Sequence, residues 1–224
     1  YNEKDREKLF TLKPLYQRAW IVFGGPLANF ILAIFIFLMI NIFVGKDFTP
    51  AMISEVTKNS PAQVAGLKKN DIILSIDDNK VKSILDVSKF ITLSTSEFID
   101  FKVSRYDQEV NVKVKPNFVE TEDNLGNKIK KRMVGIQLSP YKDTVNHQKL
   151  GPVKALYYSV TEVYFVTTST LKYLGTIITG KGDSSQLGGP IRIAKISGQV
   201  AEFGIVPFLS MMAYISISLS LIHI

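Results

Sequence analysis

A long uncharged run constrains this chain more than any other feature. Between Trp20 and Val44 no side chain is charged, and most side chains are apolar. About 20 apolar residues are enough for a helix to cross a hydrocarbon layer of roughly 30 Å. The run is too long for a signal peptide, and a polar segment over residues 1–19 precedes it. It therefore predicts a transmembrane helix over residues 20–44.

The composition indicates a chain with a membrane part and a soluble part. Of the 224 residues, 46% are hydrophobic and 21% are charged, and the formal net charge is +7. The basic residues do not interleave with aromatic residues, so nucleic-acid binding is not indicated, and anionic lipid headgroups of the bilayer are the better partner. The chain has no cysteine, which excludes disulfides and thiolate metal sites.

The middle of the chain alternates in the manner of a small α+β domain over residues 48–140. Alternation of apolar and polar side chains predicts strands at AMISEV, DIILSI, FIDFKVSRY, EVNVKVKP and RMVGIQL. Helical spacing predicts short helices at SPAQVAGL and SILDVSKFITL. Residues 116–132 form a polar insertion that we expect to be a loop. About 90 residues are enough for one modest core.

The last third of the chain is apolar but less uniform. Residues 153–180 are interrupted by Lys154, Glu162 and Lys172, so we predict an interfacial or packed amphipathic helix, with a second membrane span as the alternative. Residues 181–205 read as a glycine-rich loop and a short helix. Residues 206–224 have the composition of a transmembrane helix that we expect to be truncated.

Three segments together resemble one known family. QRAWIVFGGPLANFILA is similar to its Arg…Ala-Gly-Pro-x-x-Asn segment, with Gly24 in place of the usual alanine. VTKNSPAQVAGLKKNDIILSIDDNKV resembles a PDZ signature, and LGGPIRIAKISGQVAEFGIVPFLSMMAYISISL resembles the segment that leads into a last catalytic helix. In this order they resemble the bacterial site-2 proteases of the regulator of sigma-E type, which are intramembrane zinc metalloproteases with a PDZ domain.

The resemblance implies an α-helical membrane protein with an inserted α+β PDZ-like domain of the circularly permuted bacterial type. It also implies a multi-pass protein of the bacterial inner membrane with the PDZ-like domain outside the cytoplasm. Its substrate would be a membrane-anchored protein or the C-terminal peptide of one. The function would be regulated proteolysis, with the PDZ-like domain recruiting or filtering substrates.

The resemblance implies zinc in the full-length protein. The family holds zinc with His-Glu-x-x-His and Leu-Asp-Gly, and neither motif occurs here. We therefore expect a fragment that lacks both ends, contains no metal ligand and no catalytic residue, and is inactive alone. His223 stands where the family has an asparagine, and we do not expect it to be a ligand. His147 reads as a solvated histidine.

The PDZ-like module carries the candidate binding residues. A PDZ domain adds an extended peptide to a sheet edge, and in the permuted order the binding strand comes last. The predicted peptide-binding residues are Val134, Gly135, Ile136 and Leu138 on the strand and Val87, Phe90 and Ile91 on the facing helix, although Val87 and Ile91 could equally belong to the core. Lys128, Lys130, Lys131 and Arg132 read as a solvated basic face, with attraction of a carboxylate or of lipid as the alternative.

The start of the apolar run has two interpretations. Pro26 could sit in the first turn of the helix at the membrane interface. The resemblance favours the other interpretation, in which a helix end packs beside a wet site and Gly25, Pro26 and Asn29 line the wall of a membrane cavity.

Two other functions compete with that of a zinc protease. A membrane-tethered PDZ adaptor without catalysis fits the residues equally well. A serine protease does not fit, because GDSSQLGGP only faintly resembles the surroundings of a nucleophilic serine and no histidine–carboxylate set accompanies it.

Overall fold

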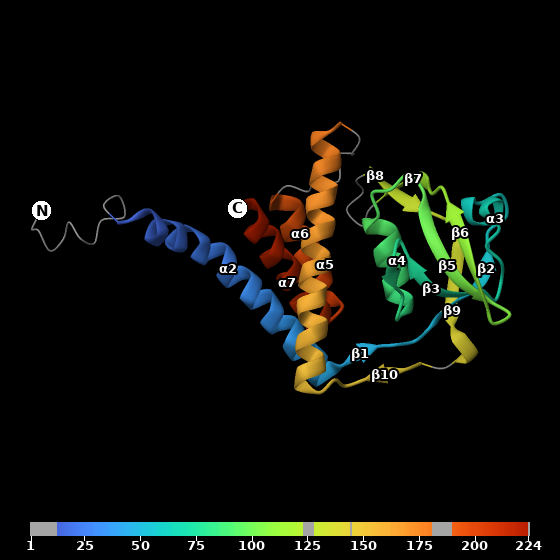
Figure 1. The fold of residues 1–224 in the computed structure, drawn as a ribbon, viewed down its shortest axis with the longest axis horizontal. Coiled ribbons are helices and arrows are strands. Elements are labelled where there is room, and N and C mark those ends of the chain that lie inside the picture. The colour runs from blue at the N-terminus through green and yellow to red at the C-terminus, as the bar shows by residue number, and fades with distance from the viewer. Residues whose placement is uncertain (1–12, 123–127, 144, 181–189, 224) are drawn as a thin grey trace, which may run out of the picture. The chain divides into compact units, whose positions relative to one another are not determined.

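The computed structural model describes residues 13–122, 128–143, 145–180 and 190–223 (Figure 1). The chain divides into two compact units. One contains residues 1–44, 151–168 and 196–224, and the other contains residues 45–150 and 169–195. We call the first the helical unit and residues 45–150 of the second the module, and each is described by itself. The glycine-rich segment 181–189 lies outside the described residues.

The apolar run forms one continuous helix. α2 covers Leu15–Met39 and passes into a π-helical turn, η2, at Ile40–Val44. Pro26 lies inside α2, well past its first turn. The proline therefore neither begins the helix nor ends it, so the prediction that a helix starts at Gly24-Gly25-Pro26 is wrong, and the assignment of Gly25, Pro26 and Asn29 to a cavity wall stays a prediction. A Cβ at Gly24 or Gly25 would meet no atom within 4 Å.

Three further helices follow the module in sequence. They are α5 at Pro152–Ile178, α6 at Pro190–Glu202 and α7 at Ile205–His223. Among the described residues, two helical stretches are long and apolar enough to cross a membrane, Leu15–Val44 and Ile205–Ile222. A small core joins α2, α5 and α7, and its buried members are Ala33, Phe37, Val163, Ala213 and Ile217.

The main sheet of the module has six strands, and the module also contains two short helices. The strands are β2 Ala51–Val56, β3 Ile72–Ile76, β4 Asn79–Lys80, β5 Ile99–Arg105, β6 Gln108–Val114 and β9 Ile136–Pro140. They form an antiparallel sheet in the order β6-β5-β3-β2-β9, with β4 beside β3. The predicted hairpin between β5 and β6 is confirmed, and Tyr106 and Asp107 take the positive φ of a two-residue turn.

The two helices of the module have clear start signals. In α3, Pro61–Ala65, the Ser60 side chain accepts from Gln63 N, and Pro61 occupies the first turn. In α4, Ile84–Leu93, Ser83 and Asp86 form a reciprocal capping box. Val87 and Ile91 of α4 are buried in the same core as Ile53, Ile73 and Phe101 of the sheet.

The polar insertion is not a plain loop. Its described residues form a two-stranded hairpin of β7 Asn117–Glu122 and β8 Lys128–Met133. By register, Glu120 stands opposite Lys130 and Glu122 opposite Lys128. The expectation of a loop over residues 116–132 is therefore wrong for the parts that the structure describes.

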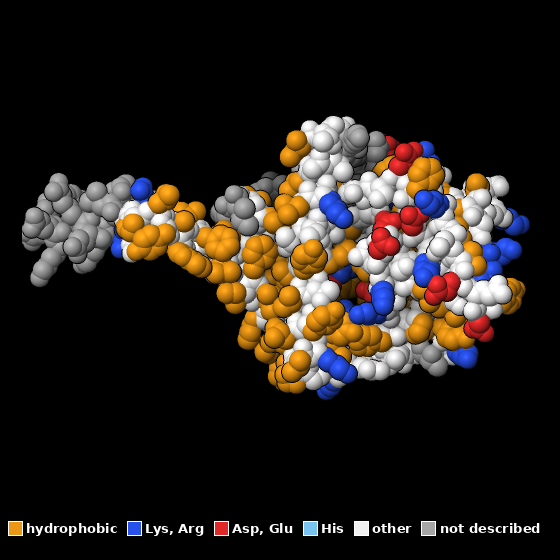
Figure 2. All heavy atoms as spheres, viewed as in Figure 1, with side chains coloured by type: hydrophobic (Ala, Val, Ile, Leu, Met, Phe, Trp, Pro, Cys, Tyr) orange, Lys and Arg blue, Asp and Glu red, His pale blue; other side chains and the backbone are white. Residues whose placement is uncertain are grey.

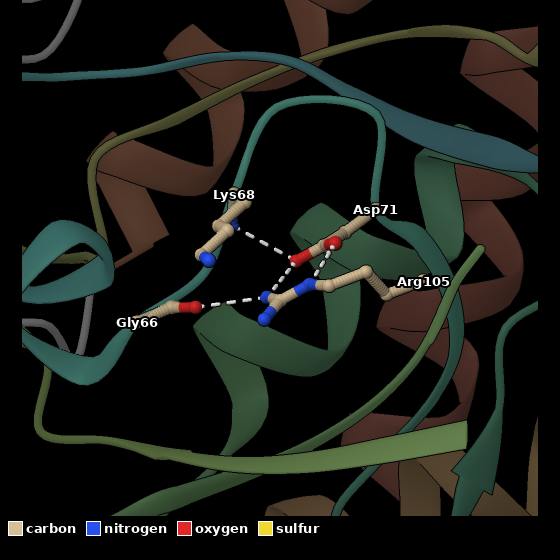
Figure 3. A network of polar contacts seen from close by, with 4 residues as sticks. All are labelled: Gly66, Lys68, Asp71 and Arg105. Carbon is tan, nitrogen blue, oxygen red and sulfur yellow. Dashed lines mark hydrogen bonds and ion pairs between the residues drawn. The ribbon is translucent and has the colours of Figure 1, made fainter. Parts of the chain in front are cut away.

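A buried ion pair fixes the turn between α3 and β3 (Figure 3). The Asp71 carboxylate accepts from Arg105 Nε and Nη2, each at 2.7 Å, and from Lys68 N at 2.9 Å. Arg105 Nη2 also donates to Gly66 O at 2.8 Å. The Asp71 side chain is 1% exposed, so these donors replace the water molecules that would otherwise hydrogen-bond to its carboxylate. The hydrogen bond to Asp71 raises the pKa of Arg105 above its usual value.

The two ends of the module pair with each other. β1, Lys46–Asp47, lies antiparallel to β10, His147–Gln148, and a short 3-10 turn, η3, covers Tyr141–Asp143. Gly45 has φ +103°, and a Cβ there would lie 2.6 Å from Gln148 O. His147 is exposed in β10 rather than in a loop.

Candidate peptide-binding edge

β9 is an edge strand of the module's sheet. It pairs with β2 on one side and with no other described strand on the other side. Gly135 O accepts from Thr57 N, and Tyr141 N donates to Pro50 O, so the odd-numbered residues of this segment face β2. Because antiparallel bonding alternates, the backbone N–H and C=O groups of Ile136 and Leu138 point to the free edge.

Side chains along this edge suit an extended peptide. Ile136, Leu138 and Phe90 are half-buried and pack against the module's core. The other edge strand of the sheet, β6, carries the exposed Glu109 and Lys113, and charged side chains discourage the addition of a strand. The β9 edge is thus the better place for a peptide to add.

Three predicted groove residues lie in the core instead. Val87 is 0% exposed, Val134 3% and Ile91 7%. Side chains this deeply buried do not line an open groove in this conformation. The sequence left Val87 and Ile91 equally open to a place in the core or in the groove, and their burial places them in the core. Val134 is buried in the core as well.

The predicted strand over Val134–Leu138 is wrong at its start. β8 ends at Met133 and β9 begins at Ile136, so Val134 and Gly135 form the break between them. Gly135 has φ +80°, and a Cβ there would lie 2.3 Å from Ser60 Cβ. Val134 O accepts from Ala62 N at 2.9 Å. Both residues therefore hold α3 against the sheet, and a β-branched residue at 135 would strain the fold itself.

Arg132 connects the β7–β8 hairpin to the end of α4. Its Nη1 and Nη2 donate to the carbonyl oxygens of Ser94 and Ser96, and its guanidinium lies 5.5 Å from the Phe118 ring centroid. Burial lowers the pKa of Arg132, while the charge of Asp77 acts the other way. Arg132 is therefore not part of a solvated face. Lys131 is exposed, and the side chains of Lys128 and Lys130 lie outside the described residues.

The three predicted cavity-wall residues lie on α2 near α7. Gly25 is exposed, Pro26 is buried and Asn29 is half-buried. Ser220 Oγ donates to Pro26 O at 2.5 Å, and Ser216 Oγ donates to Asn29 O at 2.9 Å. Sequence reasoning missed these two serines. Their spacing of four residues within an apolar segment was the available signal, because it places both hydroxyls on one helix face.

The described residues do not supply a metal site. Within ranges 13–122, 128–143, 145–180 and 190–223, no three His, Cys, Asp or Glu side chains lie close enough to hold an ion. The donors in these described ranges therefore do not fit a zinc ion.

Comparison with known proteins decides the family. The model of Peptidase family M50 matches residues 1–223, which is nearly the whole chain. The chain belongs to peptidase family M50, the site-2 proteases. Members of this family are membrane-embedded, so the two apolar helices of this M50 chain are its candidate spans.

Several relatives of this M50 chain carry protease names. A protein of Agrobacterium fabrum, named as a candidate zinc metalloprotease, is 34% identical over 99% of this chain and 59% of its own length. Metalloprotease MmpA of Caulobacter vibrioides is 31% identical over 87% of this chain and 48% of its own length. Regulator of sigma-W protease RasP of Bacillus subtilis is 30% identical over 96% and 48%. The M50 chain thus spans about 59% of the first of these relatives.

A solved structure resembles part of the chain. The PDZ domain of the SdrC-like protein of Listeria monocytogenes matches 41% of this M50 chain and 88% of its own, with 21% identity and a TM-score of 0.33. A TM-score of 0.33 does not establish a shared fold, whereas the M50 match covers residues 1–223.

Proposed function

We propose that this chain is part of an intramembrane zinc metalloprotease that performs regulated proteolysis of membrane-anchored proteins. The M50 match over residues 1–223 carries this proposal, and the two apolar helices support it. In this proposal the zinc ligands belong to parts of the protease beyond these 224 residues. The protein is a multi-pass protein of the bacterial inner membrane.

The module recruits or filters substrates by adding a peptide to β9. Its β9 backbone directs hydrogen-bonding groups at Ile136 and Leu138 toward the free edge, and the half-buried Phe90, Ile136 and Leu138 supply apolar contact. A peptide in extended conformation satisfies such an edge with main-chain hydrogen bonds, and its side chains give selectivity. The peptide is a segment or the C-terminus of a membrane-anchored substrate on the extracytoplasmic side.

Residues of α2 border the proposed active-site cavity. The carbonyl oxygens of Pro26 and Asn29 accept hydrogen bonds from serines of α7. These bonds hold this face of α2 at a defined separation from α7. Gly25 keeps the neighbouring surface free of side-chain bulk. In the proposed protease, Gly25, Pro26 and Asn29 form one wall beside the metal.

The edge assignment is tested with a proline at position 138. Leu138→Pro removes the outward N–H, while Leu138→Ala removes the same packing but keeps that N–H. We expect Leu138→Pro to weaken binding of an apolar C-terminal peptide about tenfold relative to Leu138→Ala, as measured by fluorescence anisotropy, since one or two hydrogen bonds of about 1 kcal/mol are lost. Equal affinity for the two variants would place peptide binding elsewhere.

The protease assignment is tested on the full-length gene product. We expect one zinc ion for each protein by elemental analysis, and cleavage of a model membrane-anchored substrate that a chelator abolishes. A product that binds peptide at β9 without zinc and without cleavage would identify a membrane-tethered adaptor instead. The two outcomes are independent of the Leu138 result, so either proposal can fail alone.

A further inference from the structure

One face of α5 is apolar and exposed along the first half of the helix. At 100° per residue, Val153, Leu156, Tyr157, Val160 and Tyr164 fall on a single stripe. Their exposed fractions run from 46% to 84%. Figure 2 shows hydrophobic side chains gathered along α2 and over the lower part of α5, whereas charged side chains are spread over the module. We call these five residues the α5 stripe.

The face of α5 next to the stripe is buried within the helical unit. Ala155 and Ser159 are 0% exposed and Val163 is 7% exposed. Asn41 Nδ2 donates to Ser159 Oγ at 3.0 Å, and Val163 shares a core with Ala33 and Phe37 of α2. A helix lying flat on a membrane would show water a polar face opposite its apolar one. On α5, packed protein lies along one flank of the stripe, and the exposed Lys154 and Thr161 lie along the other.

These contacts show which part of α2 lies beside each part of α5. Ser159 is level with Asn41, near the end of the apolar run, and Val163 and Val166 join the cluster of Phe37 and Ala33, which lie earlier in α2. α5 therefore starts near the end of the apolar run and points back toward the start of α2. If α2 crosses the hydrocarbon layer, this half of α5 lies at the same depth.

The charges of α5 fit this placement. Within its 27 residues the charged side chains are Lys154, Glu162 and Lys172. The two lysines are about 27 Å apart along the axis at 1.5 Å per residue, close to the roughly 30 Å of the hydrocarbon layer. A lysine near either boundary can extend its ammonium group to the headgroups. Between them, Glu162 Oε1 accepts from Tyr214 OH of α7 at 3.1 Å.

Several hydroxyl groups on α5 donate to carbonyl oxygens of the helix itself, whereas the buried Oγ1 of Thr167 has no hydrogen-bond partner among the described residues. Thr161 Oγ1 donates to Tyr157 O at 2.8 Å, and Thr168 Oγ1 donates to Tyr164 O at 2.9 Å. The candidate span α7 does the same with Ser210 and Ser218, which donate to Val206 O and Tyr214 O. In lipid, where water offers no hydrogen bonds, a hydroxyl next to an exposed apolar stripe needs such an internal acceptor.

We propose that α5 is embedded in the bilayer beside α2 and α7, with the α5 stripe facing lipid acyl chains. α5 is not among the helices that are apolar enough to be spans by composition, because its two lysines, its glutamate, its tyrosines and its hydroxyl residues lower its mean hydropathy. The proposal concerns the membrane architecture of the helical unit and does not depend on catalysis or on peptide binding.

Spin labelling tests the proposal on the whole chain in liposomes. The chain has no cysteine, so a single introduced cysteine is labelled without background. The label is placed on the stripe in Val160→Cys and Tyr164→Cys, with Leu156→Cys as a further stripe position should either variant fail to reconstitute. Val64→Cys, at an 85% exposed position of α3, is the aqueous control.

We expect stripe labels to collide several-fold more often with molecular oxygen than with a water-soluble nickel chelate, relative to the Val64 label. Collision rates with the nickel chelate equal to those at Val64 would put the stripe in water and overturn the proposal. Protection of the stripe labels from both reagents would show that protein covers it, and would also overturn it. In that case, dilution with unlabelled chains would show whether the cover is a second copy.

Discussion

At the scale of single residues, the module depends on side chains that meet their partners far away in sequence. Asp71 follows a turn, and Arg105 ends the strand β5, yet their carboxylate and guanidinium form two hydrogen bonds in the interior. Gly135 lies against Ser60 with too little space for any side chain. Both positions therefore matter for the stability of the module.

Asp71→Asn should destabilise the module strongly. An amide cannot neutralise Arg105, which then stays largely buried without its counter-charge, and breaking such a pair costs about 3 to 5 kcal/mol. Because the Arg105 side chain is 20% exposed, we expect the lower end. Hydrogen exchange measured by mass spectrometry should show faster exchange of β3 and β5 amides.

Asp100→Asn is the matched control for Asp71→Asn. Asp100 lies 3.8 Å from Lys113, and both side chains are more than half exposed. An exposed pair of this kind is worth less than about 1 kcal/mol. Equal effects of the two substitutions would mean that burial of the Asp71 pair is not what stabilises the turn.

Gly135→Ala should lower the stability of the module by about 1 to 3 kcal/mol, because an L-residue at φ +80° is strained and its Cβ meets Ser60. The midpoint of thermal unfolding is the measurement. Gly66 also has a positive φ, but a Cβ at this position would enter open space. Gly66→Ala therefore measures the cost of backbone strain without a steric contact. An equal loss in both variants would show that contact with Ser60 is unimportant.

At the scale of elements, α7 is attached to α2 by hydroxyl groups. Ser216 and Ser220 are buried, and both donate to carbonyl oxygens of α2 rather than of their own helix. Small side chains let membrane helices approach closely, and such interhelical bonds are worth about 0.6 kcal/mol each on average. The pair of serines also places α7 at a fixed register along α2.

Replacing Ser216 and Ser220 together by alanine should cost about 1 kcal/mol of helix association, measured by steric trapping in detergent micelles. Ser218→Ala is the control, because Ser218 donates within α7 to Tyr214 O. If the double variant is as stable as the control, packing alone holds the two helices together.

At the scale of the whole molecule, the two units have separate cores. The fourteen buried residues of the larger core all lie between Ala51 and Val134, within the module. The smaller core lies wholly within the helical unit. Two units whose cores share no residue should unfold independently.

Urea should therefore unfold the module at a lower concentration than it affects the helical unit in micelles. Two transitions are expected by circular dichroism, and Ile76→Ala should shift only the first, by about 2 to 4 kcal/mol for a fully buried side chain. One transition shifted as a whole by Ile76→Ala would show that the units fold as one.

Local patterns in the sequence determined most of the elements. Period-two alternation predicts β2, β5 and β6, helical spacing predicts α4, and the uncharged run predicts a membrane helix, because each signal depends on neighbours in the chain. The resemblance to site-2 proteases was confirmed by the M50 match. These features needed no knowledge of distant contacts.

Only the tertiary structure decided which apolar residues are available for binding. Val87, Ile91 and Val134 have the same chemistry as Ile136 and Leu138, and burial alone separates the two groups. Pro26 stays inside α2, a position that local propensity disfavours but that helix packing can support. The position of β9 at the sheet edge follows from strand order, which is set by contacts between residues far apart in sequence and is not encoded in any local period.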